Sequence, residues 1–249
     1  MGSPQIAMPL FADTVPDRQE AVVAAWQRLS ANGPQLVALQ GKGGIDEYAI
    51  DGRSVFVAHV AAPIPNDESR HAVRTSWMWR GSDDVLQSHR AHAIVTATQQ
   101  ESALAGAWDV AQVSAALLAA GSGVALYWGS SRQVHTAKIA IQFGASPSTA
   151  PVPLCVGIRI SAAAQTGPFS ASTCGLEALG HKEFEVRDTK MGIGELRMTL
   201  LDLAGYVLDN GPVLMHGQTT GLTAAARWKV SHEPSQLMKG HDVIVLAIP

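Results

Sequence analysis

Apolar residues near the start of the chain recur at the spacing of a helix. Val22, Trp26 and Leu29 lie four and three positions apart, which predicts a helix over residues 14–29 with Thr14 as its N-cap. The Asn-Gly-Pro tripeptide that follows ends this helix, because glycine suits a left-handed cap and proline cannot continue the helix. Beyond it, apolar and alternating stretches predict strands at 36–39, around 48 and at 54–60, with a glycine-rich hairpin turn at 41–44.

Two further helices show a regular apolar stripe. Over residues 104–118 the apolar positions are spaced by four, three, four and three, which predicts a helix with one buried face that ends at Gly121. In the last hundred residues, Leu196, Leu200 and Val207 share one face of a helix with Leu203. The opposite, exposed face of that helix is then made by Glu195, Thr199, Asp202, Tyr206 and Asp209.

The second of these helices also ends in Asn-Gly-Pro, at residues 210–212, and an apolar stretch follows it, as it follows the first helix. A duplicated helix-to-strand unit would explain this repeat. Local chemistry alone would also explain it, since Asn-Gly-Pro stops any helix. The sequence leaves both explanations open.

A stretch rich in Ser, Pro, Thr and Ala at 144–153 is the best candidate for a linker. It separates an N-terminal unit, residues 1–146, from a C-terminal unit, residues 152–249. We expect an α+β fold of two mainly antiparallel sheet-and-helix units, with the two sheets either separate or continuous. The other predicted elements are a loop at 63–80, a short helix after Ser82, and strands at 93–97, 124–128, 154–160, 181–186, 225–230 and 242–248.

Composition narrows the class of protein. The 249 residues are 47% apolar and carry a formal net charge of -3, which excludes a disordered chain and gives no electrostatic reason to expect nucleic acid. The most membrane-like window, 110–128, is cut by Gly121-Ser122-Gly123, so a buried helix followed by a buried strand explains it better. The N-terminus lacks the pattern of a signal peptide, and Cys155 and Cys174 are too few for a disulfide framework. We therefore expect a cytoplasmic protein without a membrane partner.

One cluster of polar residues could carry chemistry. On a strand, His181, Glu183 and Glu185 would line one face while Phe184 and Val186 enter the core. Such a face could hold a divalent metal or supply an acid/base pair. The alternative is an ordinary solvated strand face.

Two weaker clusters have equally ordinary alternatives. His89 and His92 are close enough on a helix to share a metal, but a histidine at a helix end can instead bind carbonyl groups. Ser130, Ser131 and His135 follow an apolar strand, yet the glycine pair of a nucleophile elbow is missing, which favours a simple turn. We expect no bound metal and no cofactor.

Partner binding has its best candidate at Trp77, Trp79 and Arg80. Together with Met78 they stand in a polar stretch, and aromatic residues, methionine and arginine are enriched in the cores of protein interfaces. The alternative is that one tryptophan plugs the edge of the core and the other covers it.

Two stretches, 175–186 (GLEALGHKEFEV) and 204–214 (AGYVLDNGPVL) with 217–221 (GQTTG), resemble the C-terminal domain of the bacterial domain-of-unknown-function family 4261. Upstream, residues 89–95 and 125–129 resemble the region that precedes that domain in longer members, so that the resemblance covers most of 83–230. Thr220 departs from the pattern, where an aliphatic residue is expected. The resemblance implies a cytosolic bacterial α+β protein with an accessory or immunity role, and it supplies no catalytic residues.

The residues and the resemblance together favour a non-enzymatic, cytosolic protein-binding protein that acts as an immunity or accessory factor to a secreted toxin. The main alternative is a metal-dependent hydrolase built on His181, Glu183 and Glu185 or on His89 and His92. A homo-oligomer whose interface uses the same tryptophans, Trp77 and Trp79, is the third possibility.

Overall fold

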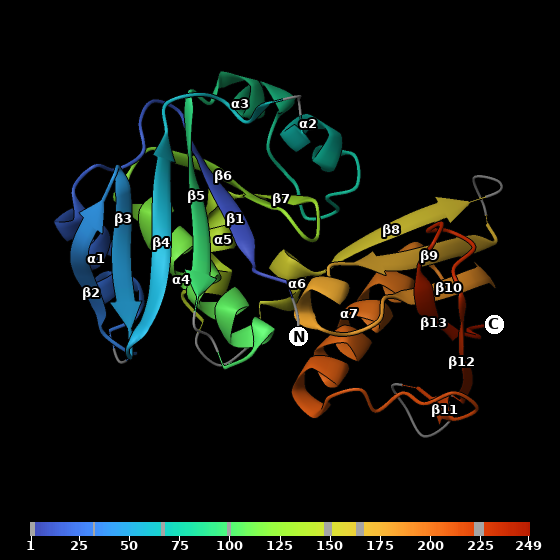
Figure 1. Ribbon diagram of the computed structural model, residues 1–249. Coiled ribbons are helices and arrows are strands. Elements are labelled where there is room, and N and C mark those ends of the chain that lie inside the picture. Colours follow the sequence, from blue (N-terminus) through green and yellow to red (C-terminus); the bar gives the residue numbers. More distant parts are fainter. Residues whose placement is uncertain are drawn as a thin grey trace. The chain divides into compact units, whose positions relative to one another are not determined.

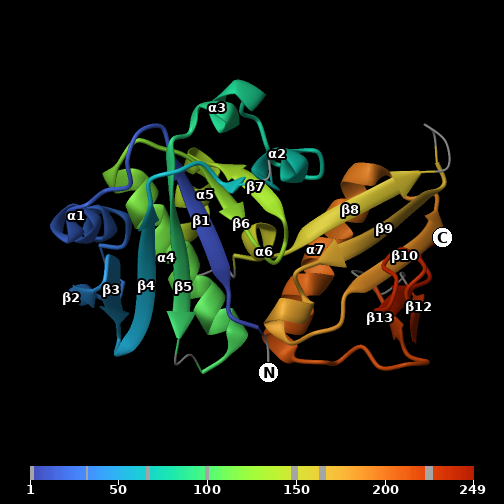
Figure 2. The same ribbon diagram turned by 45° about the horizontal axis from the view of Figure 1, so that its top comes forward.

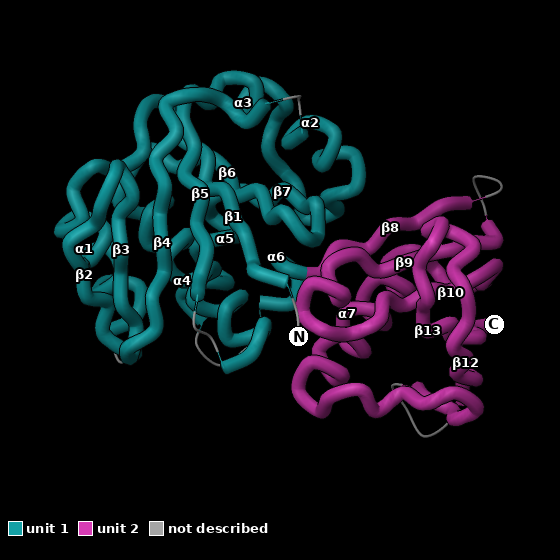
Figure 3. The backbone as a smooth tube through the Cα atoms, viewed as in Figure 1, with its two compact units in different colours: residues 1, 3–155 teal, residues 2, 156–249 magenta. Residues whose placement is uncertain are grey.

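The computed structural model describes residues 3–31, 33–65, 68–98, 101–146, 151–162, 167–221 and 227–249. Two compact units, shown in Figure 3, divide between Cys155 and Val156. Helix α6 (Val152–Cys155) is the last element of the first unit, and residues 147–150 of the predicted linker lie outside the described residues. Each unit combines a mainly antiparallel sheet with helices, which confirms the predicted α+β class. The described strands form two separate sheets, so the alternative of one continuous sheet is wrong.

The first unit is built on a seven-stranded antiparallel sheet of order β2-β3-β4-β5-β1-β6-β7. Its strands are β1 (Ile6–Phe11), β2 (Leu36–Lys42), β3 (Ile45–Ile50), β4 (Arg53–Val60), β5 (Ala91–Thr98), β6 (Gly123–Trp128) and β7 (Gln133–Thr136). Its helices are α1 (Gln19–Leu29), α2 (Glu68–Val73), α3 (Asp83–Ser88), α4 (Ala103–Ala120) and α5 (Ala137–Gly144), with α6 after them. The turn between β2 and β3 is the predicted glycine-rich hairpin.

Helix α4 is the core helix of the first unit (Figure 1). It packs between α1, α5 and the strands β1 and β5, so nearly its whole circumference is buried and the predicted single buried stripe is wrong. By length and composition this helix could cross a membrane, but 67% of that window is buried inside the protein. The prediction of a buried helix followed by a buried strand is confirmed, because α4 is followed by β6 after Gly121.

The predicted start of the first helix is wrong. Helix α1 begins at Gln19, and Thr14 and Pro16 precede it in an extended segment. Val15 is buried there, and the ring of Pro16 lies against Gly121, where an added Cβ would come within 2.7 Å of it. Packing against the end of α4 therefore overrides the local N-cap signal.

The second unit has a six-stranded sheet of order β11-β12-β13-β10-β9-β8, in which only the β10–β13 pair is parallel among the described strands (Figure 2). Its elements are β8 (Gly157–Ala162), β9 (Phe169–Cys174), the 3-10 turn η2 (Glu177–Leu179), β10 (Phe184–Thr189), α7 (Ile193–Asn210), β11 (Thr219–Thr220), β12 (Trp228–Pro234) and β13 (Asp242–Leu246). The predicted strand at 181–186 in fact begins at Phe184, and the one at 154–160 begins at Gly157.

Helix α7 packs on β8 and β9 through the predicted apolar face, whose four residues are all buried. Thr199, predicted on the exposed face, is also buried. Gly211 ends the helix at a φ of 81°, in the left-handed region where glycine is favoured, and its N–H donates to the carbonyl of Val207. The predicted helix stop is confirmed.

The two units share an order of elements. In the first, β1 is followed by α1 and by the antiparallel meander β2-β3-β4; in the second, β10 is followed by α7 and the meander β11-β12-β13. The last strand of the meander pairs directly with β10 in the second unit, whereas β5 lies between β4 and β1 in the first. The repeated Asn-Gly-Pro tripeptide does not stand at equivalent points, because α1 ends at Leu29, before the tripeptide, whereas α7 ends at Asn210 within it.

Candidate functional site

The tryptophan loop, residues 77–80, connects α2 to α3. Trp79 is half-buried and packs against a hydrophobic cluster that includes Leu86 and Tyr127, while its ring lies over Gly81. The Arg80 guanidinium donates to the carbonyls of Trp77 (2.7 Å) and Trp79 (2.9 Å). Arg80 therefore holds the loop together, and Trp79 covers the edge of the core. The second interpretation of this loop thus agrees with the structure for Trp79, while Trp77 is not among the residues packed on that cluster.

Glu183 is buried and precedes strand β10 instead of lying within it. Its carboxylate accepts hydrogen bonds from the Thr173 hydroxyl (2.6 Å) and from the backbone N–H groups of Gly175 and Glu177 (2.7 and 3.0 Å). Burial raises the pKa of Glu183, against the lowering effect of these donors. This carboxylate satisfies the backbone at the start of the η2 turn.

Glu185 is also fully buried, but it has a different set of donors. They are the Arg187 guanidinium, the Ser235 hydroxyl and the backbone N–H groups of Gln236 and Leu237. Burial alone would raise the pKa of Glu185, but the donors outweigh burial and the pKa lies below its ordinary value. Because Glu183 and Glu185 share no donor and both are enclosed, the expected solvated face with His181 is wrong. Both carboxylates accept hydrogen bonds from donors of the chain itself.

The two histidines near α3 are bound to the backbone. His89 accepts a hydrogen bond at Nε2 from the N–H of Ile64 (2.9 Å), and its Nδ1 contacts the Leu86 carbonyl at the end of α3. His92 Nδ1 lies 2.7 Å from the Ala62 carbonyl, and burial lowers the pKa of His92. The alternative of a histidine that binds carbonyls at a helix end is therefore confirmed for His89.

Two residues of the serine-histidine cluster, Ser131 and His135, are buried, and Ser130 is half-buried. Ser131 is fully buried and donates to the carbonyl of Leu154 (2.8 Å), while Ser130 Oγ hydrogen-bonds with Gln5 and Trp128. His135 is 1% exposed, and burial lowers its pKa to about 4. No three His, Cys, Asp or Glu side chains within the described ranges are grouped so that they could hold a metal ion.

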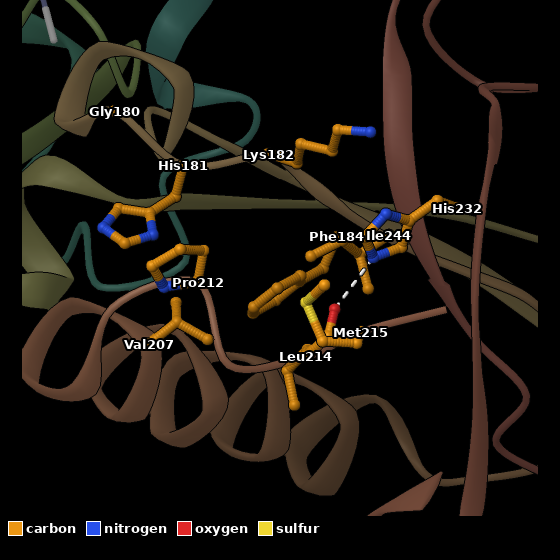
Figure 4. A pocket seen from close by; sticks show the side chains of 10 residues that line it. All are labelled: Gly180, His181, Lys182, Phe184, Val207, Pro212, Leu214, Met215, His232 and Ile244. Carbon is orange, nitrogen blue, oxygen red and sulfur yellow. Dashed lines mark hydrogen bonds between the residues drawn. The ribbon is translucent and has the colours of Figure 1, made fainter. Parts of the chain in front are cut away.

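A cavity of about 160 Å³ in the second unit is the best candidate for a functional site (Figure 4). The register of the sheet builds its floor: Phe184 of β10 pairs with Ile244 of β13, which pairs with His232 of β12. Val207, in the last turns of α7, lies opposite this row. We call it the His181–His232 cavity; its lining residues are Gly180, His181, Lys182, Phe184, Val207, Pro212, Leu214, Met215, His232 and Ile244.

Two loops form the walls of the cavity. Gly180 ends the η2 turn with a φ of 88°, and this left-handed turn carries the chain to His181 and Lys182 at the rim. On the other side, the segment after α7 is held to β12, because His232 Nε2 hydrogen-bonds to the carbonyl of Leu214 (2.8 Å) and the His232 N–H donates to His216 Nδ1 (3.1 Å). Figure 4 shows the rings of His181 and His232 at opposite ends of the cavity.

The lining is apolar with few polar groups. Burial lowers the pKa of His181, so its ring is neutral at pH 7, and Lys182 is the only formally charged residue among the ten. None of the ten lining residues carries a carboxylate. This arrangement can bind an apolar group and one hydrogen-bond acceptor.

The sequence patterns identified His181 but not its neighbours in the cavity. Gly180-His181-Lys182 and the segment 211–214 belong to the two stretches that carry the family resemblance. No pattern in the sequence indicates that these two stretches lie side by side in the fold. His232 gave no signal, because only the pairing of β12 with β13 brings it beside Ile244.

The comparisons with known proteins bear on this same unit. Residues 172–247 match the domain of unknown function DUF4261, which confirms the resemblance predicted for the C-terminal part. All ten residues that line the cavity lie within the matched stretch. Neither the search of curated proteins nor the search of solved structures gave a match.

Proposed function

We propose that this chain is a non-enzymatic, cytoplasmic protein-binding protein whose C-terminal unit anchors one apolar side chain of a partner protein in the His181–His232 cavity. The volume of the cavity is the main observation in support of this proposal. Sites for whole small-molecule ligands or cofactors commonly have volumes of about 300–1,000 Å³, whereas an apolar cavity of about 150 Å³ admits a single benzene ring. The 160 Å³ found here fit one large side chain.

The chemistry of the lining agrees with a binding role. Anchor residues of protein interfaces insert into dry, well-packed pockets near the centre of the contact. Met215, at the rim, is 54% exposed, and Pro212 beside it is also exposed, so the cavity opens onto an apolar border. The buried carboxylates nearby, Glu183 and Glu185, hydrogen-bond to their own chain and do not line the cavity.

The family resemblance directs the choice of partner. It implies an accessory or immunity role, and we propose a secreted bacterial toxin as the partner. The tryptophan loop of the N-terminal unit is a second, independent candidate for a contact, because Trp77 and Arg80 are partly or fully exposed.

Affinity capture with the full-length chain tests the proposal. Val207→Phe fills the cavity from α7, and Ile193→Phe, at an exposed position of the same helix, is the matched control. We expect the wild type and Ile193→Phe to retain the same stoichiometric partner from the native host and Val207→Phe to lose it about tenfold or more, the effect of an interface hot spot. Thermal melts show whether each variant is folded. Equal capture by all three folded proteins would exclude the cavity as the binding site.

A further inference from the structure

The polar side chains at the His181–His232 cavity differ in whether they already have hydrogen-bond partners. His232 holds the wall of the cavity, with Nε2 bound to the Leu214 carbonyl and its backbone N–H bound to His216. The side chains of His181 and Lys182 have no hydrogen-bond or charged partner among the described residues. They follow one another in the chain, but Figure 4 shows the His181 ring at one end of the cavity and the Lys182 side chain extending the other way, so the two groups do not converge.

The single formal charge of the lining favours an anion. It belongs to Lys182, whose ammonium carries three donors and no acceptor. None of the ten lining residues carries a carboxylate that could compete for these donors or attract a cation. A hydrogen bond from an ammonium to a carboxylate is about twice as strong as a neutral one.

We propose that the cavity binds a carboxylate attached to an apolar group, and that the natural source of this group is the C-terminal residue of the partner protein. This inference rests on the proposed function. In a C-terminal Leu, Ile, Val or Phe, one residue carries both the side chain that fills the apolar floor and the carboxylate that pairs with the ammonium of Lys182, an exposed side chain on a flexible stem. An internal apolar residue has a neutral peptide group at that place, and capture of chain ends by backbone and cationic donors is a known mode of recognition.

Three probes separate the sources of this chemistry. N-acetyl-leucine represents a chain end, N-acetyl-leucinamide removes its charge, and 4-methylpentanoate represents a free carboxylic acid. Each is titrated into the isotope-labelled full-length protein, and NMR shifts of His181, Phe184 and Leu214 report binding. We expect N-acetyl-leucine to bind at least about fivefold more tightly than the amide, the effect of one partly exposed charge-assisted hydrogen bond.

Two lysine variants test whether Lys182 causes the preference for the acid over the amide. Lys182→Met keeps the apolar stem and should abolish the preference for the acid over the amide, whereas Lys229→Met, on an exposed position of β12 outside the lining, should preserve it. Equal affinity of acid and amide in the wild type, or shifts by neither probe at its solubility limit, would overturn the inference. If 4-methylpentanoate binds about tenfold more tightly than N-acetyl-leucine, the occupant is a free acid and the assignment to a chain end is wrong.

The failure of this inference is distinguishable from the failure of the proposed function. If Val207→Phe stays folded and still captures the partner, the proposed function fails whatever the probes show. If Val207→Phe loses the partner but the probes do not distinguish acid from amide, the cavity is an anchor site and only the carboxylate assignment fails.

Discussion

Glu185 shows how a single buried residue can resemble a catalytic group and yet stabilise the fold. Its four donors come from β10 and from the segment after β12, so one carboxylate joins two parts of the chain. We expect Glu185→Gln to lower the free energy of unfolding by about 2–3 kcal/mol at pH 7, because an amide cannot accept from all four donors and leaves Arg187 without its buried partner. Chemical denaturation measures the loss, with the exposed Glu195→Gln as the control.

The dependence on pH follows from the same residue. The pKa of Glu185 in the folded protein lies below its ordinary value of 4.5, so the ionised carboxylate stabilises the fold above that value. This stabilisation is lost as the pH falls through the folded pKa. The difference in unfolding free energy between wild type and Glu185→Gln should therefore be constant near neutral pH and shrink in acid. A difference that grows in acid would contradict the lowered pKa.

His135 is the converse case, a buried base. Its interaction with the backbone of Leu154 favours the charged ring, but burial outweighs this interaction and lowers the pKa to about 4 from an ordinary value of 6.5. The unfolded chain therefore takes up a proton as the pH falls from 6.5 to 4 while the folded protein does not. This difference should cost the wild type about 3 kcal/mol of stability over that range.

His135→Leu removes both the proton uptake of the unfolded chain and the buried imidazole ring. We expect this variant to be at least as stable as the wild type at pH 7 and to lose less stability than the wild type on acidification, as measured by denaturation at pH 7, 5.5 and 4.5. His71→Leu, at an exposed position of α2, is the matched control and should follow the wild type. Parallel curves for the wild type and His135→Leu would show that His135 is not the buried neutral base described here.

At the scale of elements, the apolar face of α7 and the hairpin between β2 and β3 were predicted correctly, whereas the wide burial of α4 and other features that depend on tertiary contacts were not. The apolar face of α7 and its stop at Gly211 depend on local chemistry, and the sequence contains that chemistry. The predicted start of α1 was wrong because Val15 is buried and Pro16 packs against the distant Gly121, which no local signal reports. Likewise, the alternation over 181–186 was real, but the donors that enclose Glu183 and Glu185 come from residues 173–177 and 235–237. The cavity depends on the register of three strands, and a pattern along one segment cannot give that register.

The tryptophan loop is the element whose two interpretations a stability measurement can separate. Trp79 packs on the cluster around Leu86, so Trp79→Ala should lower the unfolding free energy by about 2 kcal/mol, less than the 3–5 kcal/mol of a fully buried tryptophan. Trp77 is not part of that packing, and Trp77→Ala should cost less than about 1 kcal/mol. If Trp77→Ala also weakens capture of the partner about tenfold, the loop is a second contact. Full capture by a folded Trp77→Ala would remove the loop from the binding surface.

At the scale of the whole molecule, the domain match and the structural unit have different limits. The match to DUF4261 begins at residue 172, within β9, whereas the second unit begins at Val156 and includes β8. Strand β8 pairs with β9 along its length, and its buried Ile158 lies on a strand that contacts α7. The core of this unit therefore extends beyond the matched residues.

This difference predicts the smallest fragment that keeps the cavity. A fragment of residues 156–249 has a complete sheet and its own buried core, so it should unfold in one cooperative transition and give a dispersed NMR spectrum. A fragment of residues 172–249 lacks β8 and half of β9, which exposes the edge of the sheet and uncovers the face of α7 that contacts β8. We expect it to show a broad transition or to aggregate, and to lose the response of His181 and Leu214 to N-acetyl-leucine. Equal stability of the two fragments would mean that the matched stretch is by itself a complete folding unit and that β8 is an addition to it.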